Sequence, residues 1–236
     1  MGKRLYQINN ENVFSNITPM SAYWLGFFAA DGYIIKDRNS IGIGLSERDI
    51  KQIEMFRDFI GSTHPIHLRE KTKAVTFCIN STILKNDISK WIPAKTERDT
   101  KNSMISCIDD DYKDYFIAGY FDGDGSVFSW YNKGIEIESY AVTIVGNYNT
   151  LYDMTKHLSK RHSFRKLTIV KNDNVFRLAW GSKNDITEFS KIYFKSPLQL
   201  ERKLIKYTYI IKELENKKGR KQKYTVGNKA NKTKED

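Results

Sequence analysis

The sequence Trp24-Leu-Gly-Phe-Phe-Ala-Ala-Asp31-Gly32 returns 93 positions later as Ile117-Ala-Gly-Tyr-Phe-Asp-Gly-Asp124-Gly125. Both blocks read apolar, apolar, Gly, aromatic, Phe, any residue, small, Asp, Gly. The segments after the two blocks also correspond, so the chain is an internal duplication rather than a chance repeat of nine residues. We expect each block to form a helix.

The first repeat continues with an alternating run, residues 41–45, that predicts a strand. A capping pattern at Ser46–Asp49 precedes apolar residues at helical spacing, and Gly61 is a plausible helix stop. Two strand-like runs then surround residues 68–73, and a helix is predicted over 83–91.

The second repeat has the same order. We expect a strand over 140–145, a helix over 149–160 and a hairpin made by 164–170 and 175–180 around a polar turn. Apolar residues at helical spacing near Ile186–Ile192 predict a closing helix.

Each half therefore predicts an α-β-β-α-β-β-α order, an α+β fold with two pseudo-symmetric halves. The amphipathic strands should pack one sheet face on helices and leave the other free. We place the N-terminal half at 1–108, the C-terminal half at 109–214 and a basic, mobile tail at 215–236. Asp109–Asp111 marks the join and can favour the N-terminus of the second motif helix.

The charge of the chain favours a polyanionic partner. Lys and Arg number 39 against 28 Asp and Glu, a formal net charge of +11. The longest apolar run, about 23–30, is too short to span a membrane, and the N-terminus lacks the apolar region of a signal peptide. The two cysteines form neither a disulfide framework nor a zinc site, and we expect them to be small buried residues of an intracellular protein that acts with DNA.

Small residues form a stripe on each motif helix. Ala22, Gly26 and Ala30 recur every four residues, as do Gly119 and Gly123. An interior glycine costs a helix about 1 kcal/mol, so its presence in both copies suggests that the two helices approach each other closely.

If the helices pair in this way, Asp31 and Asp124 meet at their C-terminal ends, each just before a glycine that ends its helix. Two carboxylates there repel each other and the negative ends of the helix dipoles. Bound divalent cations would compensate, because hard cations take carboxylate and carbonyl oxygens. The matched pair therefore predicts a metal site, although a lone Asp before Gly would be an ordinary turn residue.

The two blocks resemble the LAGLIDADG motif, and residues 18–212 resemble a monomeric, double-motif LAGLIDADG homing endonuclease. The second block is a very close match. In the first, Trp24 and Leu25 replace the opening Leu-Ala, and Ala29 replaces the first Asp, but the eighth position is Asp in both.

This resemblance implies motif helices at the interface of two halves whose saddle-shaped antiparallel sheets follow the DNA major groove. It implies that Asp31, Asp124 and the backbone carbonyls of Ala30 and Gly123 hold divalent metal, with Mg²⁺ as the expected ion and Mn²⁺ or Ca²⁺ able to replace it for binding. The reaction would hydrolyse one phosphodiester in each strand of a long site. Family members also place a basic residue near each metal, and the matched lysines Lys95 and Lys195 are our candidates.

Side chains on the exposed strand faces and hairpin tips are candidates for DNA contacts. In the first half these are Lys36, Arg38, Ser40, Arg69, Lys71 and Lys73, and in the second Ser129, Tyr131, Lys133, Glu138, Arg165, Lys166, Lys171 and Arg177. Strand register decides which of them face the groove, since a slip of one residue reverses every side chain. Because the halves differ at almost all these positions, the expected target is asymmetric.

Other functions fit the same motifs. LAGLIDADG proteins also include RNA maturases that bind intron RNA and regulators that bind DNA without cleavage. A remoter alternative is a basic structural DNA-binding protein in which the motifs only pack helices. Metal dependence separates them, because a nuclease needs divalent ions to form product and a binder does not.

Overall fold

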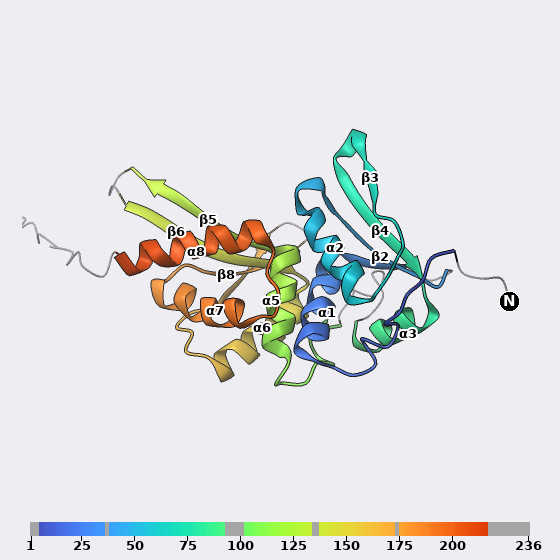
Figure 1. The fold of residues 1–236 in the computed structure, drawn as a ribbon. Coiled ribbons are helices and arrows are strands. Elements are labelled where there is room, and N and C mark those ends of the chain that lie inside the picture. The colour runs from blue at the N-terminus through green and yellow to red at the C-terminus, as the bar shows by residue number, and fades with distance from the viewer. Residues whose placement is uncertain (1–4, 36–37, 93–101, 134–136, 173–174, 217–236) are drawn as a thin grey trace, which may run out of the picture.

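A computed structural model describes residues 5–35, 38–92, 102–133, 137–172 and 175–216 (Figure 1). The predicted basic tail lies outside the described residues apart from its first two positions, and so do Lys36 and Lys95. None of the helices in the described ranges is long and apolar enough to cross a bilayer.

The first half has the predicted order of elements. They are α1 (Pro19–Asp31), β1 (Gly32–Ile35), β2 (Ser40–Ser46), η1 (Glu47–Asp49), α2 (Ile50–Phe59), β3 (His67–Arg69), η2 (Glu70–Thr72), β4 (Ala74–Asn80) and α3 (Thr82–Trp91). Gly61 lies just after α2 with a φ of 62°, which confirms it as a helix stop. The capping box expected at Ser46 does not form, because η1 occupies those residues and the Ser46 side chain makes no capping hydrogen bond.

The second half repeats this order and adds one helix. Its elements are α5 (Lys113–Asp124), β5 (Gly125–Asn132), β6 (Ile137–Gly146), α6 (Tyr148–Arg161), β7 (Thr168–Asn172), β8 (Val175–Trp180), α7 (Lys183–Lys195) and α8 (Glu201–Asn216). The sequence pattern did not predict α8 as a separate element. It lies along β5 and β6 in Figure 1.

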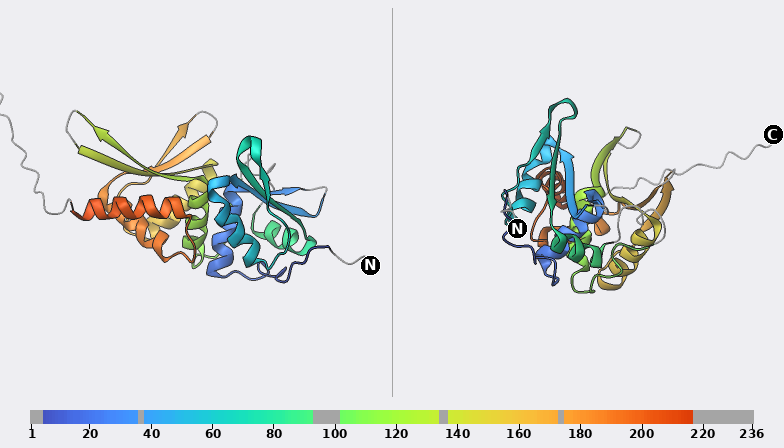
Figure 2. Two further views of the ribbon diagram at one scale, coloured as in Figure 1. Left: turned by 45° about the horizontal axis from the view of Figure 1, so that its top comes forward. Right: turned by 90° about the vertical axis from the view of Figure 1, so that its right-hand side faces the viewer.

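The strands form two antiparallel sheets of four, with orders β1-β2-β4-β3 and β5-β6-β8-β7. Each packs one face on helices, as the alternation predicted: Val75, Phe77 and Ile79 of β4 are buried, whereas Cys78 between them is exposed. The strands of both sheets lie on one side of the molecule and the helices beneath them (Figure 2, left). This confirms the α+β fold with two pseudo-symmetric halves.

The two motif helices lie side by side at the centre (Figure 1). A Cβ on Gly26 would lie 1.9 Å from the carbonyl oxygen of Phe116, and a Cβ on Gly119 would lie 1.9 Å from that of Tyr23. Glycine is therefore required in both helices, because any side chain would collide with the backbone of the partner helix.

The expectation for the cysteines was wrong, because Cys78 and Cys107 are both exposed free thiols. Cys78 lies on the sheet face turned away from the helices. The alternation of side chains along β4 determines this position, and the small size of cysteine has no influence on it.

Candidate metal centre and nucleic-acid surface

The motif helices end beside each other and run directly into the edge strands β1 and β5. Gly32 and Gly125 end them with φ of −78° and −90°, in extended rather than left-handed backbone. Glycine is needed there for space: a Cβ on Gly32 would meet the ring of Phe28 at 2.4 Å, and one on Gly125 the ring of Phe121 at 2.1 Å. The helix C-termini thus open at once onto the sheets.

Asp31 and Asp124 lie together at these ends. A Cβ on Gly123 would lie 2.3 Å from the Cβ of Ala30 and 3.2 Å from a carboxylate oxygen of Asp31. Burial raises the pKa of Asp31 to about 6; the Asp124 carboxylate adds to the rise, and Lys203 and Arg202 oppose it. The pair is therefore electrostatically costly in the absence of a further positive charge.

Lys203, near the start of α8, supplies a buried positive charge next to this pair. Its ammonium donates hydrogen bonds to the carbonyl oxygens of Phe121, Asp122 and Gly123 at 2.6, 2.7 and 3.2 Å. It thus caps the C-terminal end of α5, where the helix dipole is negative. Burial lowers the pKa of Lys203 to about 8, although the carboxylates of Asp122, Asp31 and Asp124 raise it.

A buried hydrogen-bond network around Asp122 holds the second motif helix in place. The Asp122 carboxylate accepts from the hydroxyls of Tyr23 and Tyr193 at 2.8 and 2.7 Å and from the backbone N–H of Leu200 at 2.8 Å. Gln52 in turn donates to the Tyr23 hydroxyl at 2.6 Å. Asp122 thereby ties both motif helices to the segment that enters α8, and so positions Lys203.

The structure describes only one of the two lysines predicted from the repeat. Lys195 is exposed at the C-terminal end of α7, and no described contact joins it to either motif aspartate. Lys95 lies outside the described residues. Lys203 was missed, but the sequence carried a signal for it: the buried positions of α8 are 203, 207, 210 and 214, and Lys203 stands in that stripe where an apolar residue is expected.

The donor set at this centre fits a hard divalent cation. Two carboxylates and the backbone carbonyls of Ala30 and Gly123 are oxygen ligands of the kind that Mg²⁺ and Ca²⁺ prefer. Burial and the Asp124 carboxylate raise the pKa of Asp31, and a cation would stabilise this carboxylate in its charged form. The Gly123 carbonyl also accepts from Lys203, and its second lone pair leaves room for another partner.

The sheet faces turned away from the helices carry two of the predicted DNA contacts. Arg69 lies on this open face, since it pairs with Ala74, the neighbour in β4 of core-facing Val75. Arg177 lies on the open face of the second sheet between Val145 and Val170. Its Nε is buried and has no hydrogen-bond partner among the described residues.

Three other predicted contacts share the face of β5 and β6 that packs toward α8. Ser129 and Tyr131 have the same strand parity as buried Val127, and their cross-strand partners are Tyr140 and Glu138. Burial raises the pKa of Tyr140, and the carboxylates of Glu138 and of Glu213 on α8 raise it further. The open face of β5 instead presents Phe128 and Trp130, whose rings lie 5.8 Å apart and which were not among the predicted contacts.

The remaining predicted contacts lie at hairpin tips, in one loop and in the interior. Exposed tip residues are Arg38, Lys71, Lys73 and Lys133. Arg165 and Lys166 are exposed before β7, and Lys171 is exposed with the parity of helix-facing Phe176. Ser40 is 2% exposed and its hydroxyl donates to the side chain of Asn80, so it holds β2 to β4.

Comparison with solved structures identifies the fold of this chain. The LAGLIDADG homing endonuclease I-LtrWI bound to target DNA superposes with a TM-score of 0.62 at 10% identity, over 86% of this chain and 92% of that one. The chain has the LAGLIDADG homing endonuclease fold.

Two further LAGLIDADG structures agree with this assignment. I-GzeII in complex with its DNA target gives a TM-score of 0.60 at 12% identity over 88% of this chain and 94% of that one. The meganuclease I-AabMI bound to uncleaved DNA gives 0.62 at 15% identity over 85% and 92%. No family model and no curated protein matches the sequence, so the likeness is one of structure.

Proposed function

We propose that this protein is a metal-dependent endonuclease that binds a long, asymmetric double-stranded DNA site and hydrolyses one phosphodiester in each strand. The observation that carries the proposal is the pairing of Asp31 with Asp124 at the ends of two adjacent helices, where each helix runs into the first strand of its sheet. The LAGLIDADG structures with this fold include complexes with DNA, and one of them, of I-SmaMI, was determined in the presence of calcium ions.

The sheets have dimensions suited to a DNA groove. The ten residues of β6 span about 33 Å at ~3.3 Å per residue, close to the ~34 Å of one DNA turn. The longest strands of the first sheet, β2 and β4, have seven residues and span about 23 Å, so the pair would follow somewhat less than two turns. Arg69 and Arg177 can reach guanine edges or phosphates from the open faces, and the exposed lysines at the hairpin tips would contact phosphates.

The centre has the parts that phosphodiester hydrolysis requires. Asp31 and Asp124 would hold the cation with the carbonyls of Ala30 and Gly123, and a bound divalent ion supplies Lewis acidity and an activated water. Lys203 keeps a positive charge beside the aspartates, where it stabilises negative charge that develops on the phosphate. We propose Lys203, rather than Lys195, as the basic residue of this centre.

Selection and subsequent cleavage test the proposal. Rounds of binding from random duplex DNA, with Ca²⁺ present, enrich the target, and the enriched duplexes are then incubated with Mg²⁺ or with EDTA. We expect Mg²⁺-dependent double-strand cuts at one position of a shared asymmetric sequence. Enriched binding with no cutting in Mg²⁺ or Mn²⁺ would contradict the nuclease and support a maturase or regulator, for which intron RNA is the next ligand.

Substitution of the aspartates tests the centre itself. Asp31→Asn and Asp124→Asn each remove one charge, and we expect double-strand cutting to fall by about 10²-fold or more while the Kd for DNA changes little. Asp58→Asn is the matched control, because Asp58 is exposed on α2 and pairs with its neighbour Arg57. Full cutting by both motif variants would rule out the assigned metal ligands.

A further inference from the structure

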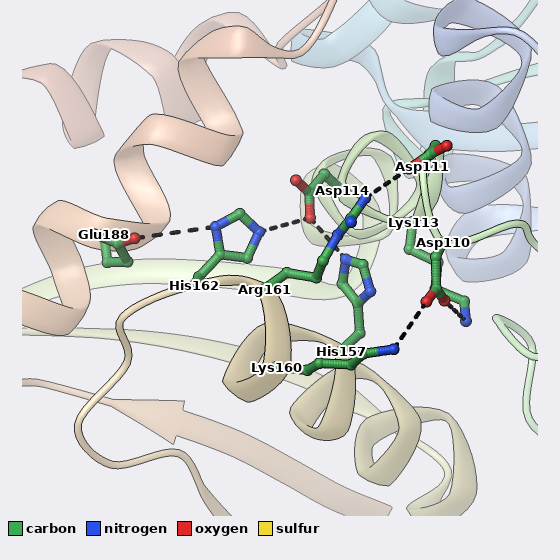
Figure 3. Close-up of polar contacts among 9 residues, drawn as sticks. All are labelled: Asp110, Asp111, Lys113, Asp114, His157, Lys160, Arg161, His162 and Glu188. Carbon is green, nitrogen blue, oxygen red and sulfur yellow. Dashed lines mark hydrogen bonds and ion pairs between the residues drawn. The ribbon is translucent and has the colours of Figure 1, made fainter.

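Asp114, His157 and His162 form a compact cluster in the C-terminal half, remote from the motif aspartates (Figure 3). Asp114 lies in the first turn of α5 and Asp124 in its last, so about 15 Å of helix separates them at ~1.5 Å per residue. His157 belongs to α6, and His162 comes just after the C-terminal end of that helix. Three chain segments thus converge on one point.

The geometry of the cluster presents three ligand atoms together. The Nε2 atoms of His157 and His162 each lie 2.9 Å from the same oxygen, Oδ1 of Asp114, and all the ligand atoms lie within 4.8 Å of one another. Ligands of a tetrahedral zinc ion are about 3.3 Å apart at metal–ligand distances of ~2.0–2.1 Å. The two nitrogen–oxygen spacings of 2.9 Å need to open by only a few tenths of an ångström.

The neighbouring basic side chains pair with other carboxylates and not with this cluster. Lys113 and Lys160 pair with Asp110, and Arg161 pairs with Asp111 (Figure 3). Among the residues that the structure describes, Asp114 is paired only with the two histidines. A cation at this point would therefore meet a carboxylate that no lysine or arginine already neutralises.

Glu188 of α7 lies behind the His162 ring. Its Oε1 accepts a hydrogen bond from the backbone N–H of Ser163 at 3.2 Å and lies 4.0 Å from Nδ1 of His162, on the far side of the ring from Asp114. This separation is longer than a hydrogen bond, but a carboxylate that closes to hydrogen-bond distance behind a metal-bound imidazole fixes the ring and favours the tautomer whose Nδ1 carries the hydrogen. In that tautomer Nε2 is free to bind a metal.

We propose that Asp114, His157 and His162 bind a zinc-class divalent metal ion, distinct from the hard cation of the nuclease centre. Two imidazoles and one carboxylate suit Zn²⁺, Co²⁺ or Ni²⁺, whereas Mg²⁺ takes oxygen ligands. On binding, the hydrogen on each Nε2 moves to Nδ1 by exchange with solvent, or is released to solvent where the imidazole was charged, and a water fills the fourth position. The ion clamps the first turn of α5 to the C-terminal end of α6, so its effect is on the stability of the C-terminal half.

Binding and thermal unfolding with defined metals test the site. The full chain, stripped with chelator, is titrated with Zn²⁺ by calorimetry and with Co²⁺ by its visible absorption, both in excess Mg²⁺. We expect one equivalent to bind, a Co²⁺ spectrum of tetrahedral type and a Tm raised by several degrees. Absence of stoichiometric binding of both ions at micromolar concentration would overturn the proposal.

Variants separate this site from other histidines and from the nuclease centre. We expect His162→Gln and Asp114→Asn to lose the bound equivalent and the rise in Tm. His162 is used because it is more exposed than His157, at 17% against 3% of the side chain, and its loss disturbs the core less. His67→Gln, on exposed β3, and Asp31→Asn should keep the equivalent; its loss in Asp31→Asn, or its survival in His162→Gln, would contradict the assignment.

Discussion

Lys203 shows how a single buried charge can organise the end of a helix. Its ammonium satisfies three carbonyl oxygens of α5 and lies over the ring of Phe121 at 5.1 Å from the centroid. The same charge opposes the rise in the pKa of Asp31. One side chain therefore both completes the fold of the motif and sets the electrostatics of the centre.

Replacement of this lysine separates the two candidates for the basic residue. We expect Lys203→Met to lower the rate of single-turnover cleavage by roughly 10²-fold, since a positioned proton donor or charge contributes about 10²–10⁴-fold. It should also lower the free energy of unfolding by about 1–3 kcal/mol, because buried carbonyls lose their donor. Lys195→Met is the matched control and should change neither quantity; a larger loss of cleavage in Lys195→Met would reverse the assignment.

The residues that sequence reasoning located and missed differ in a physical way. Sequence reasoning singled out Asp31 and Asp124 because the repeat marks them twice. Lys203 has no counterpart that the repeat reveals, and only its place in the buried stripe of α8 distinguishes it. Ser129 and Tyr131 were predicted to contact DNA, but they share the strand parity of the face toward α8, because no sequence pattern at an exposed hairpin tip fixes which parity points toward the helices.

At the scale of elements, the contact between α1 and α5 depends on backbone meeting backbone. We expect Gly26→Ala to lower the free energy of unfolding by about 3 kcal/mol or more, which is at or above the upper end of the usual cost of overpacking. The cost is high because the added methyl would collide with the backbone carbonyl of Phe116, which cannot rotate away. Chemical denaturation measures this. Gly44→Ala is the matched control, because its Cβ would meet a methyl of Thr76 at 3.6 Å and the carbonyl oxygen of Val75 at 4.0 Å, both ordinary contacts; equal stability of the two variants would contradict the packing argument.

The segment before α1 is held by a polar contact with α3. The Asp87 carboxylate accepts from the Ser15 hydroxyl at 2.5 Å and from the Lys90 ammonium at 2.6 Å. Burial raises the pKa of Asp87, but these two hydrogen bonds outweigh it, and the net pKa lies below the usual 3.8. This contact thereby fastens the segment that precedes α1 to α3, the last helix of the first repeat.

This contact predicts a pH dependence of stability. Because the folded pKa of Asp87 is depressed, its stabilisation is fully present above pH 3.8 and is lost as the pH falls through the lower folded value. We expect Asp87→Asn to be less stable than the parent at pH 7 and the difference to shrink below about pH 4, as measured by urea unfolding at each pH. A difference that stays constant down to about pH 2 would show that the charge is not responsible.

At the scale of the whole molecule, sequence reasoning succeeded with architecture because duplication and alternation are periodic signals. The order of elements in each half, the two sheets and the pairing of the motif helices were all predicted. Helix α8 was missed because it falls outside the repeated order, and it covers the sheet face to which Ser129 and Tyr131 belong.

The net charge of +11 predicts how DNA binding responds to salt. Each phosphate contact contributes a slope of about −0.9 in log K against log salt, so roughly 6–10 contacts would weaken binding by about 10³–10⁵-fold between 50 and 200 mM. Fluorescence anisotropy with the enriched duplex and with a scrambled duplex measures this. A flat response with both would contradict a sheet that tracks the DNA backbone.

The contact between the two motif helices is reciprocal. Gly26 meets the carbonyl of Phe116, and Gly119 meets that of Tyr23; each partner lies 93 positions from its equivalent. One half-length sequence would satisfy both contacts against a second copy of itself, so the contact has the reciprocity of a symmetric dimer interface. The two halves are nevertheless not interchangeable there, because the second block has the buried carboxylate of Asp122 where the first block has Ala29.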